Sequence, residues 1–138
     1  VKEKVKVADF NNANRNFEDE IRLREEAILD IKDIETDSII DIESDYTTQK
    51  QNYKIGNALF MQKNYAEAIP YLEKSIAEAD AREDLVVEKD ATRKLSEVYR
   101  ESGDFENARK KYDEYIKSVE ALFVKKEQQI TQIGRAHV

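Results

Sequence analysis

The residue types that most often carry out catalysis are scarce in this chain. Its 138 residues include no cysteine and one histidine, His137, which lies next to the C-terminus. Without a thiol, and with no other imidazole, the usual nucleophile–base pairs, zinc sites and proton shuttles cannot be assembled. The three glycines are isolated from one another, so the chain also lacks a phosphate-binding glycine loop.

Carboxylates are the abundant class of reactive side chain. The chain has 30 Asp and Glu residues, but an acid–base pair requires a pocket that shifts their pKa values, and most of these carboxylates fall on polar faces of predicted helices. We therefore expect no catalytic residue, no metal site and no cofactor in this segment. The amides, bases and aromatic rings that remain are suited to binding another polypeptide.

The net charge of −7 is unevenly distributed. Residues 17–46 contain twelve acids and three bases, a balance of −9, whereas sixteen bases after residue 46 balance sixteen acids. Because no basic stripe is available to neutralise phosphates, a nucleic-acid partner is not expected. The acidic region is a solvated helix face or, alternatively, a docking surface for a basic partner. No apolar run approaches the roughly 18 residues that cross a bilayer, so we expect no membrane span in this segment.

A long repeat must position these side chains. Residues 54–76, KIGNALFMQKNYAEAIPYLEKSI, return in altered form as residues 94–116, KLSEVYRESGDFENARKKYDEYI. In each copy an amphipathic segment carries a small residue, Gly56 or Ser96, and ends in a short polar break. A second segment opens with an aromatic residue and has alanine three positions later. The repeat predicts two copies of one architectural unit.

The apolar residues of each copy have helical spacing. They recur every three or four residues, which lines them along one side of a 3.6-residue helix, and alternating strand patterns are absent. The residues concerned are Tyr65, Ala68, Leu72 and Ile76 in the first copy, and Phe105, Ala108, Tyr112 and Ile116 in the second. Paired helices approach within about 8–10 Å only where side chains are small. We therefore expect Gly56 to lie against Ala68, and Ser96 against Ala108.

This pattern resembles the tetratricopeptide repeat (TPR) family, whose small, aromatic and alanine positions recur over about 34 residues. The matching residues are Ile55, Gly56, Leu59, Ala68, Leu72 and Ser75 in one repeat, and Leu95, Ser96, Tyr99, Ala108, Tyr112 and Tyr115 in the next. Asn52 and Thr92 replace the family's tryptophan, and Asp80 and Glu120 replace its closing proline. The resemblance implies an all-α, TPR-like α-solenoid of antiparallel helix hairpins. A generic array of helical hairpins is the alternative.

We interpret residues 1–132 as a single helical array. Its parts are a degenerate repeat at 1–36, clear repeats at 44–80 and 84–119, and an exit or capping helix at 119–132. The first repeat is degenerate because Glu20 occupies the position of Ala68 and Ala108, and a glutamate is not expected to pack at a close helix crossing. The forty-residue offset between the clear repeats exceeds the family period, which we interpret as extra helix near residues 81–88.

The connection between the first two repeats is expected near Asp37, with the next helix starting early and running to about Gln62. Isoleucines at positions 39, 40 and 42 require burial there, and a short strand is the alternative. The last helix is predicted to outrun its repeat, because Val119, Phe123 and Ile130 continue a seven-residue spacing from Ile116. It either caps the array or begins a connector to a downstream element.

Both ends of the chain carry signs of processing. The first residue is valine, so we expect the chain to be a piece of a longer protein, with any secretory start upstream. The final six residues, IGRAHV, match one reading frame of a common sequencing-library adapter. We therefore interpret residues 133–138, and His137 with them, as a tail that does not belong to the natural protein.

In the TPR family the leading helix of each repeat lines a concave groove that holds peptides. The resemblance places on this groove Lys50, Tyr53, Asn57, Phe60 and Met61 of one repeat, and Asp90, Arg93, Lys94, Glu97 and Arg100 of the next. It implies apolar contacts from the aromatic rings, a hydrogen bond from Asn57 to a peptide backbone, and pairing of Arg93 or Lys94 with a carboxylate. Alternatively, Tyr53 and Phe60 belong to the core and the charges are only solvated.

Two functions from different classes follow from the resemblance. Residues 90–132 are similar to the end of the repeat region in sensor histidine kinases of the Bacteroidetes type, where a long helix leads to a membrane span and a kinase core. This implies a non-catalytic sensory or regulatory module of a two-component system, which binds a protein or peptide, or self-associates, on the periplasmic side of a membrane-anchored receptor. The alternative is a free-standing cytoplasmic scaffold that holds partner proteins together.

Overall fold

The computed structural model describes residues 1–37 and 42–136, and within these ranges the chain is helical and has no β-strand. The described α-helices are α1 (Lys2–Ala13), α2 (Phe17–Asp37), α3 (Thr48–Met61), α4 (Tyr65–Ala81), α5 (Leu85–Glu101) and α6 (Phe105–Ala136). A short 3-10 helix, η1 (Ser44–Tyr46), precedes α3. The predicted all-α class is confirmed.

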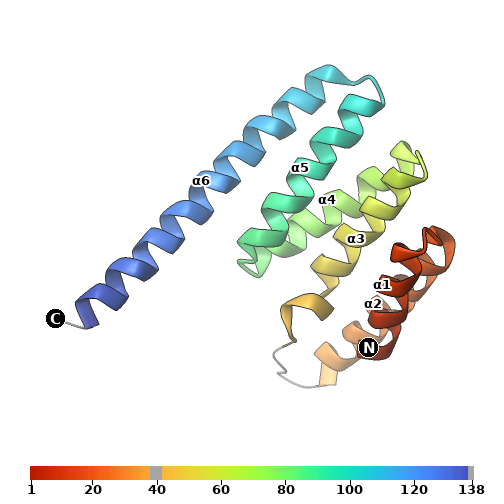
Figure 1. Cartoon of the computed structure of the whole chain (residues 1–138), viewed down its shortest axis with the longest axis horizontal. Helices are drawn as coiled ribbons and strands as arrows, with labels where there is room; N and C mark the ends of the chain where they lie inside the picture. Colours follow the sequence, from red (N-terminus) through yellow and green to blue (C-terminus); the bar gives the residue numbers. More distant parts are fainter. Residues whose placement is uncertain (38–41, 137–138) are drawn as a thin grey trace.

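The helices form three antiparallel hairpins, α1 with α2, α3 with α4, and α5 with α6, which stack side by side (Figure 1). The second helix of each hairpin packs on the first helix of the next, α2 on α3 and α4 on α5. The α1–α2 hairpin and α6 therefore lie at opposite ends of the stack (Figure 1). This is the predicted solenoid, in which each hairpin completes its core with a neighbour.

The three hairpin turns end their first helices in the same way. Arg15, Lys63 and Gly103 adopt left-handed conformations, with φ angles of 59°, 65° and 88°. The Lys63 N–H donates to the Phe60 carbonyl at 2.9 Å, and the N–H of the next residue donates to the Leu59 carbonyl at 2.8 Å. The other two turns repeat this pair of bonds, which is a Schellman motif. Residues at equal distances from these three turn residues are therefore structurally equivalent.

The core lies between consecutive hairpins. Its fully or largely buried members are Ile28, Ile55, Leu59, Ala68, Leu72, Ala91, Leu95 and Val98. A β-carbon built on Gly56 would lie 2.5 Å from Cγ of Leu72, so Leu72, and not the expected Ala68, provides the atoms nearest to this glycine. In the last hairpin the Ser96 hydroxyl donates to the Ala108 carbonyl at 2.8 Å, so these expected neighbours do lie together.

The connections between hairpins differ from the sequence-based expectation in two places. The helix α3 starts later than expected, because η1 comes first and the Thr47 hydroxyl caps α3 by accepting the Lys50 N–H at 3.3 Å. Of the three isoleucines expected to be buried, Ile42 is partly buried, and positions 39 and 40 lie outside the described residues. The extra helix expected near residues 81–88 is interrupted at Glu83, which has a left-handed φ of 56°. Asp84 then caps α5 by accepting the Val87 N–H at 3.2 Å.

The final helix is much longer than the others. It has 32 residues, against 17 in each of α4 and α5, so the predicted exit helix at residues 119–132 is a continuous extension of the last hairpin. The interpretation of residues 133–138 as a foreign tail stays a prediction. His137 lies outside the described residues.

We expect the substitution Lys63→Gly to stabilise the fold. A residue other than glycine in the left-handed conformation costs roughly 1 kcal/mol, partly offset by the greater freedom of glycine in the unfolded chain, and the Lys63 side chain is exposed. Urea unfolding followed by circular dichroism should show a gain of about 0.5 kcal/mol in unfolding free energy. Gly103→Ala, at the equivalent position, should lose about 1 kcal/mol. A loss in Lys63→Gly would contradict the strain assigned to this turn.

Candidate peptide-binding groove

Three adjoining cavities lie on the face of the stack formed by α1, α3 and α5. Their volumes are about 320, 540 and 280 Å³. Asn12 and Asn57 line both the first and the second cavity. Lys94 lines the second and third, and Tyr53 the first and third. The three cavities adjoin at these shared lining residues, and together we call them the leading-helix groove.

Most of the residues predicted for the site line this groove. They are Tyr53, Asn57, Met61, Asp90, Arg93, Lys94 and Glu97. The Lys50 ammonium lies beside the groove, 5.8 Å from the centre of the Tyr53 ring. Arg100 does not line these cavities, and it forms an exposed ion pair with Glu101 at 3.4 Å.

Tyr53 and Phe60 also contribute to the core. Both are partly buried and pack against the buried cluster, so the core role that the sequence left open applies to both. The Phe60 ring contacts the Tyr65 ring, and the two ring centres are 5.8 Å apart. The Lys94 ammonium lies 4.5 Å from the centre of the Phe60 ring. Phe60 therefore positions a groove cation and offers little free surface of its own.

The basic side chains of the groove outnumber their carboxylate partners. Glu97 accepts a hydrogen bond from Lys94 at 2.8 Å and lies 3.5 Å from Nε of Arg93, and Asp90 lines the same cavity, so two cations face two carboxylates there. Lys94 and Arg15 both line the middle cavity, and no carboxylate is among its described lining residues. An excess of positive charge in a recess attracts anionic groups. This part of the groove therefore favours a ligand that carries a carboxylate.

Asn57 contains an unsatisfied polar atom at the centre of the groove. Its Oδ1 is buried and has no hydrogen-bond partner among the described residues. Buried polar atoms nearly always have a partner, and leaving one unpaired costs roughly 1–3 kcal/mol. An N–H group supplied by a ligand would remove this cost if neighbouring side chains moved, because the oxygen itself has no exposed surface. Tyr53 and Met61 lie one turn to either side of Asn57 on α3, and Met61 is 45% exposed.

A buried charged network, which the sequence did not predict, lines the first cavity. Arg24 is 1% exposed and donates to Glu20 at 2.9 Å, to Gln51 at 2.8 Å and to Asp9 at 2.6 Å. Glu20 is fully buried, and its second oxygen accepts from Asn12 at 2.9 Å. The expectation that Glu20 would not pack at a close crossing is therefore wrong, because Arg24 and Asn12 satisfy its two oxygens.

A paired exchange in the sequence could have revealed this network. Counted from the turn residues, Glu20 and Arg24 are equivalent to Ala68 and Leu72 of the next hairpin. Two apolar core positions one helical turn apart have thus been replaced together by opposite charges. Considered alone, a buried glutamate is unfavourable, but a matched arginine at the neighbouring core position neutralises it.

Asp9 connects the network to the rim of the groove. Its carboxylate accepts from Arg24 and from the Lys54 ammonium, the latter at 3.0 Å. Partial burial raises the pKa of Asp9, but the hydrogen bonds from Arg24 and Lys54 outweigh burial and hold the pKa below its ordinary value. Its contribution to stability is therefore present above pH ~4 and is lost as the pH falls through the folded-state pKa.

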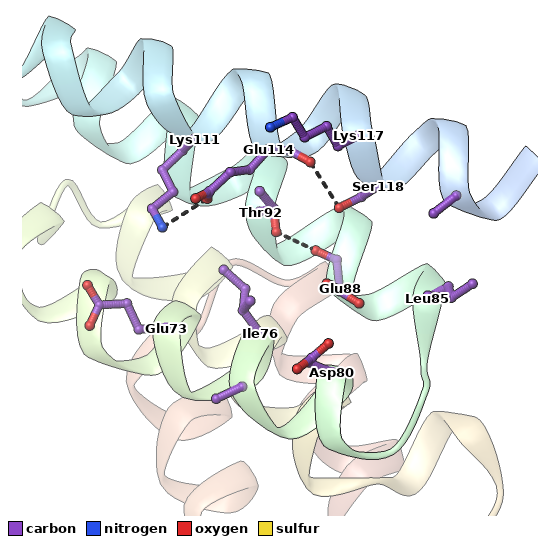
Figure 2. Close-up of a pocket in the computed structure, with 12 residues that line it drawn as sticks. Glu73, Ile76, Asp80, Leu85, Glu88, Thr92, Lys111, Glu114, Lys117 and Ser118 are labelled. Carbon is purple, nitrogen blue, oxygen red and sulfur yellow. Dashed lines mark hydrogen bonds and ion pairs between the residues drawn. The ribbon is translucent and has the colours of Figure 1, made fainter.

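A larger cavity of about 710 Å³ lies between α4, α5 and α6 (Figure 2). None of the predicted residues lines it. Its acidic lining residues are Glu73, Asp80, Glu88 and Glu114. Burial, together with the charge of Asp80, raises the pKa of Glu88. Lys111 pairs with Glu114 at 3.0 Å and Ser118 donates to the Glu114 carbonyl at 3.1 Å, so much of the polar lining is satisfied within its own helix.

The comparison with known families identifies the class of protein. Residues 46–121 match the family described as tetratricopeptide repeat, and these 76 residues (46 through 121) are more than half of the chain. The chain belongs to the tetratricopeptide repeat family. Tetratricopeptide repeats generally mediate protein–protein interaction and are typically non-catalytic, so the expected class of partner is a protein. Searches of curated proteins and of solved structures gave no match.

Membrane and metal features were also sought in the described ranges. No helix there is long and apolar enough to cross a membrane. No group of three or more His, Cys, Asp or Glu side chains in those ranges could hold a metal ion.

We expect Glu20→Ala to destabilise the fold, because it removes the buried carboxylate that pairs with Arg24 and leaves only the half-exposed Asp9 as its counter-charge. Breaking one partner of a buried ion pair typically costs about 3 kcal/mol. The double substitution Glu20→Ala, Arg24→Leu introduces the two residue types that the next hairpin has at the equivalent positions, Ala68 and Leu72. It should recover most of the lost unfolding free energy. Urea unfolding of the two variants and the parent protein measures both effects. A double variant as unstable as the single one would show that the network is not exchangeable with an apolar contact.

Proposed function

We propose that this chain is a protein- or peptide-binding module whose leading-helix groove holds an extended segment that carries a carboxylate. The single observation that supports the proposal most directly is the buried, unpartnered Oδ1 of Asn57. A folded chain rarely leaves such an atom unpaired. A bound peptide backbone would supply the missing N–H donor once the surrounding side chains move to open this oxygen, which has no exposed surface in the free chain.

The surroundings of Asn57 fit the rest of an extended peptide. Tyr53 and Met61 lie on either side of Asn57 on α3 and can contact apolar side chains of the ligand. On the adjacent helix, Lys94 also lines the middle cavity together with Arg15, and no carboxylate is among the described lining residues of that cavity, so a ligand carboxylate can pair with these two cations. The carboxylate can come from an acidic side chain or from a C-terminus.

Binding of fluorescently labelled peptides, followed by anisotropy, tests this proposal. A library of acidic peptides is compared with matched peptides in which Asp and Glu are replaced by Asn and Gln. We expect Asn57→Ala to weaken binding of all bound peptides by about tenfold, which corresponds to about 1.4 kcal/mol. We expect Lys94→Ala to weaken binding of the acidic peptides selectively.

Lys74→Ala is the matched control, because Lys74 is an exposed lysine on α4, outside the groove. It should leave the affinity unchanged, and circular dichroism should show that all variants remain folded. Equal affinity of Asn57→Ala, Lys94→Ala and the parent protein for every bound peptide would reject the groove as the site. Absence of binding throughout the library would reject peptide recognition.

The wider context that we propose is a sensory or regulatory module of a two-component histidine kinase. The resemblance of residues 90–132 to the repeat regions of such kinases supports it. The continuous helix α6 also supports it, because residues 105–132 lie in one uninterrupted helix that can transmit a movement of the last hairpin over its length. In this context the groove faces the periplasm.

The alternative is a scaffold that holds partners together in the cytoplasm without signalling. The gene sequence downstream of the codon for Gln132 separates the two functions. A transmembrane helix followed by a kinase domain is the expected result. A stop codon or further repeats at that place would instead favour the scaffold.

A further inference from the structure

The second helices of the first two hairpins are joined by a hydrogen bond. The Tyr71 hydroxyl of α4 donates to the Glu25 carboxylate of α2 at 2.6 Å, and this bond, together with burial, raises the pKa of Tyr71 to about 12. Counted from the turn residues, the equivalent pair between α4 and α6 is Glu73 and Lys111. A carboxylate and an ammonium thus occupy the two positions through which the preceding pair of helices is joined.

Glu73 and Lys111 face the same cavity without pairing. Lys111 turns to Glu114 of its own helix, with the two charged groups 3.0 Å apart, and Glu73 lies on α4 at the other side of the cavity (Figure 2). Burial and the charge of Glu73 raise the pKa of Tyr99, whereas the charge of Lys111 lowers it. Both charged groups therefore lie near this hydroxyl, and the space between them is open.

A second tie that holds α4 is also missing at α6. Glu78 of α4 accepts hydrogen bonds from Thr48 at 2.5 Å and from Asn52 at 2.6 Å, both on α3. The equivalent of Glu78 on α6 is Ser118, whose shorter side chain donates to the Glu114 carbonyl at 3.1 Å. The bonds between the two helices of the middle hairpin are thus replaced, in the last hairpin, by a bond inside α6.

The polar ties that α6 keeps to the stack lie toward its hairpin turn. The Ser96 hydroxyl of α5 donates to the Ala108 carbonyl at 2.8 Å, and the Arg93 guanidinium lies 5.8 Å from the centre of the Tyr115 ring. From Arg109 onward, each side-chain hydrogen bond and ion pair of α6 within the described residues joins two residues of that helix. The turn is therefore the fixed end of α6.

We propose that α6 has a second position, closed on α4, in which the Lys111 ammonium leaves Glu114 and pairs with Glu73. The motion is a pivot about the hairpin turn, and it narrows the cavity between α4 and α6. The closed contact repeats, between α4 and α6, the tie that already joins α2 and α4. The last helix is then a lever with two positions on a stack that is otherwise fixed.

Little stability is lost when Lys111 changes its partner. The pair that it leaves is a surface pair three residues apart on one helix, with the Glu114 side chain 54% exposed, and such pairs contribute little. Closing also covers apolar atoms of Ile76 and Leu85, which line the cavity from α4 and α5. The opposing cost is the partial desolvation of Glu73, which is exposed in the open position.

Pulsed electron paramagnetic resonance between two spin labels tests the proposal. The chain contains no cysteine, so Ala81→Cys on α4 and Gln128→Cys on α6 give a single labelled pair, and both side chains are exposed. We expect two label-to-label distances, of which the shorter belongs to the closed position. Glu73→Gln and Lys111→Gln should each abolish the shorter distance, because each removes one half of the closing pair.

Glu114→Gln separates a change of partner from a general effect of charge. It releases Lys111 from its own helix and should raise the population with the shorter distance about twofold, the size expected for one surface pair of a helix. Glu106→Gln is the matched control, because it breaks the ion pair with Lys110 at 3.4 Å on the same helix, outside the cavity. It should leave both populations unchanged.

The reversed pair Glu73→Lys, Lys111→Glu should restore the shorter distance that each neutral substitution removes. A single distance that is the same in the parent protein, Glu73→Gln and Glu114→Gln would overturn the proposal. An equal response to Glu114→Gln and Glu106→Gln would also overturn it. Circular dichroism should show that every variant keeps its helix content. Asn57→Ala should leave both distances unchanged, so this result is independent of peptide binding in the leading-helix groove.

Discussion

The structure depends on one constraint, which is that no hairpin of this chain can bury its apolar stripe alone. Leu72 illustrates the constraint. It lies against Gly56 of its own hairpin and in the same buried cluster as Leu95 of the next, and complete burial of a leucine contributes about 2 kcal/mol. Because the stripe is shared between neighbours, the distance and angle between hairpins follow from side-chain contact. The three identical left-handed turns keep that contact in register along the chain.

The same constraint creates the groove. Packing the second helix of each hairpin on the first helix of the next uses one side of each leading helix and leaves another side uncovered. Polar groups on the uncovered side, such as the amide of Asn57 and the ammonium of Lys94, are held in place by a core that they do not join. A rigid face with an unsatisfied acceptor and surplus positive charge is a suitable surface for binding a polypeptide, because little ordering of the protein remains to be done on binding.

The first hairpin satisfies the constraint by different chemistry. Where the next hairpin has Ala68 and Leu72, it has Glu20 and Arg24, whose charges are buried and neutralise each other. A buried ion pair is not more stable than a good apolar contact, but it tolerates fewer alternative neighbours. The arginine also reaches Asp9, which is paired with Lys54 at the rim, so the network connects the junction of the first two hairpins to the groove.

The sequence by itself determined the all-α class, the hairpin turns and the repeat family, because helix phase and turn chemistry are local properties of the chain. It did not determine the start of α3 or the turn at Glu83, and the expected face of Tyr53, Asn57 and Lys94 came from the family resemblance. Only the tertiary structure decided which polar atoms are satisfied. The partners of Arg24 come from α1, α2 and α3, and the isolation of Asn57 Oδ1 depends on everything packed around it. The hydrogen bonds and the burial of these polar groups depend on residues that are distant in sequence, so no local sequence pattern predicts them.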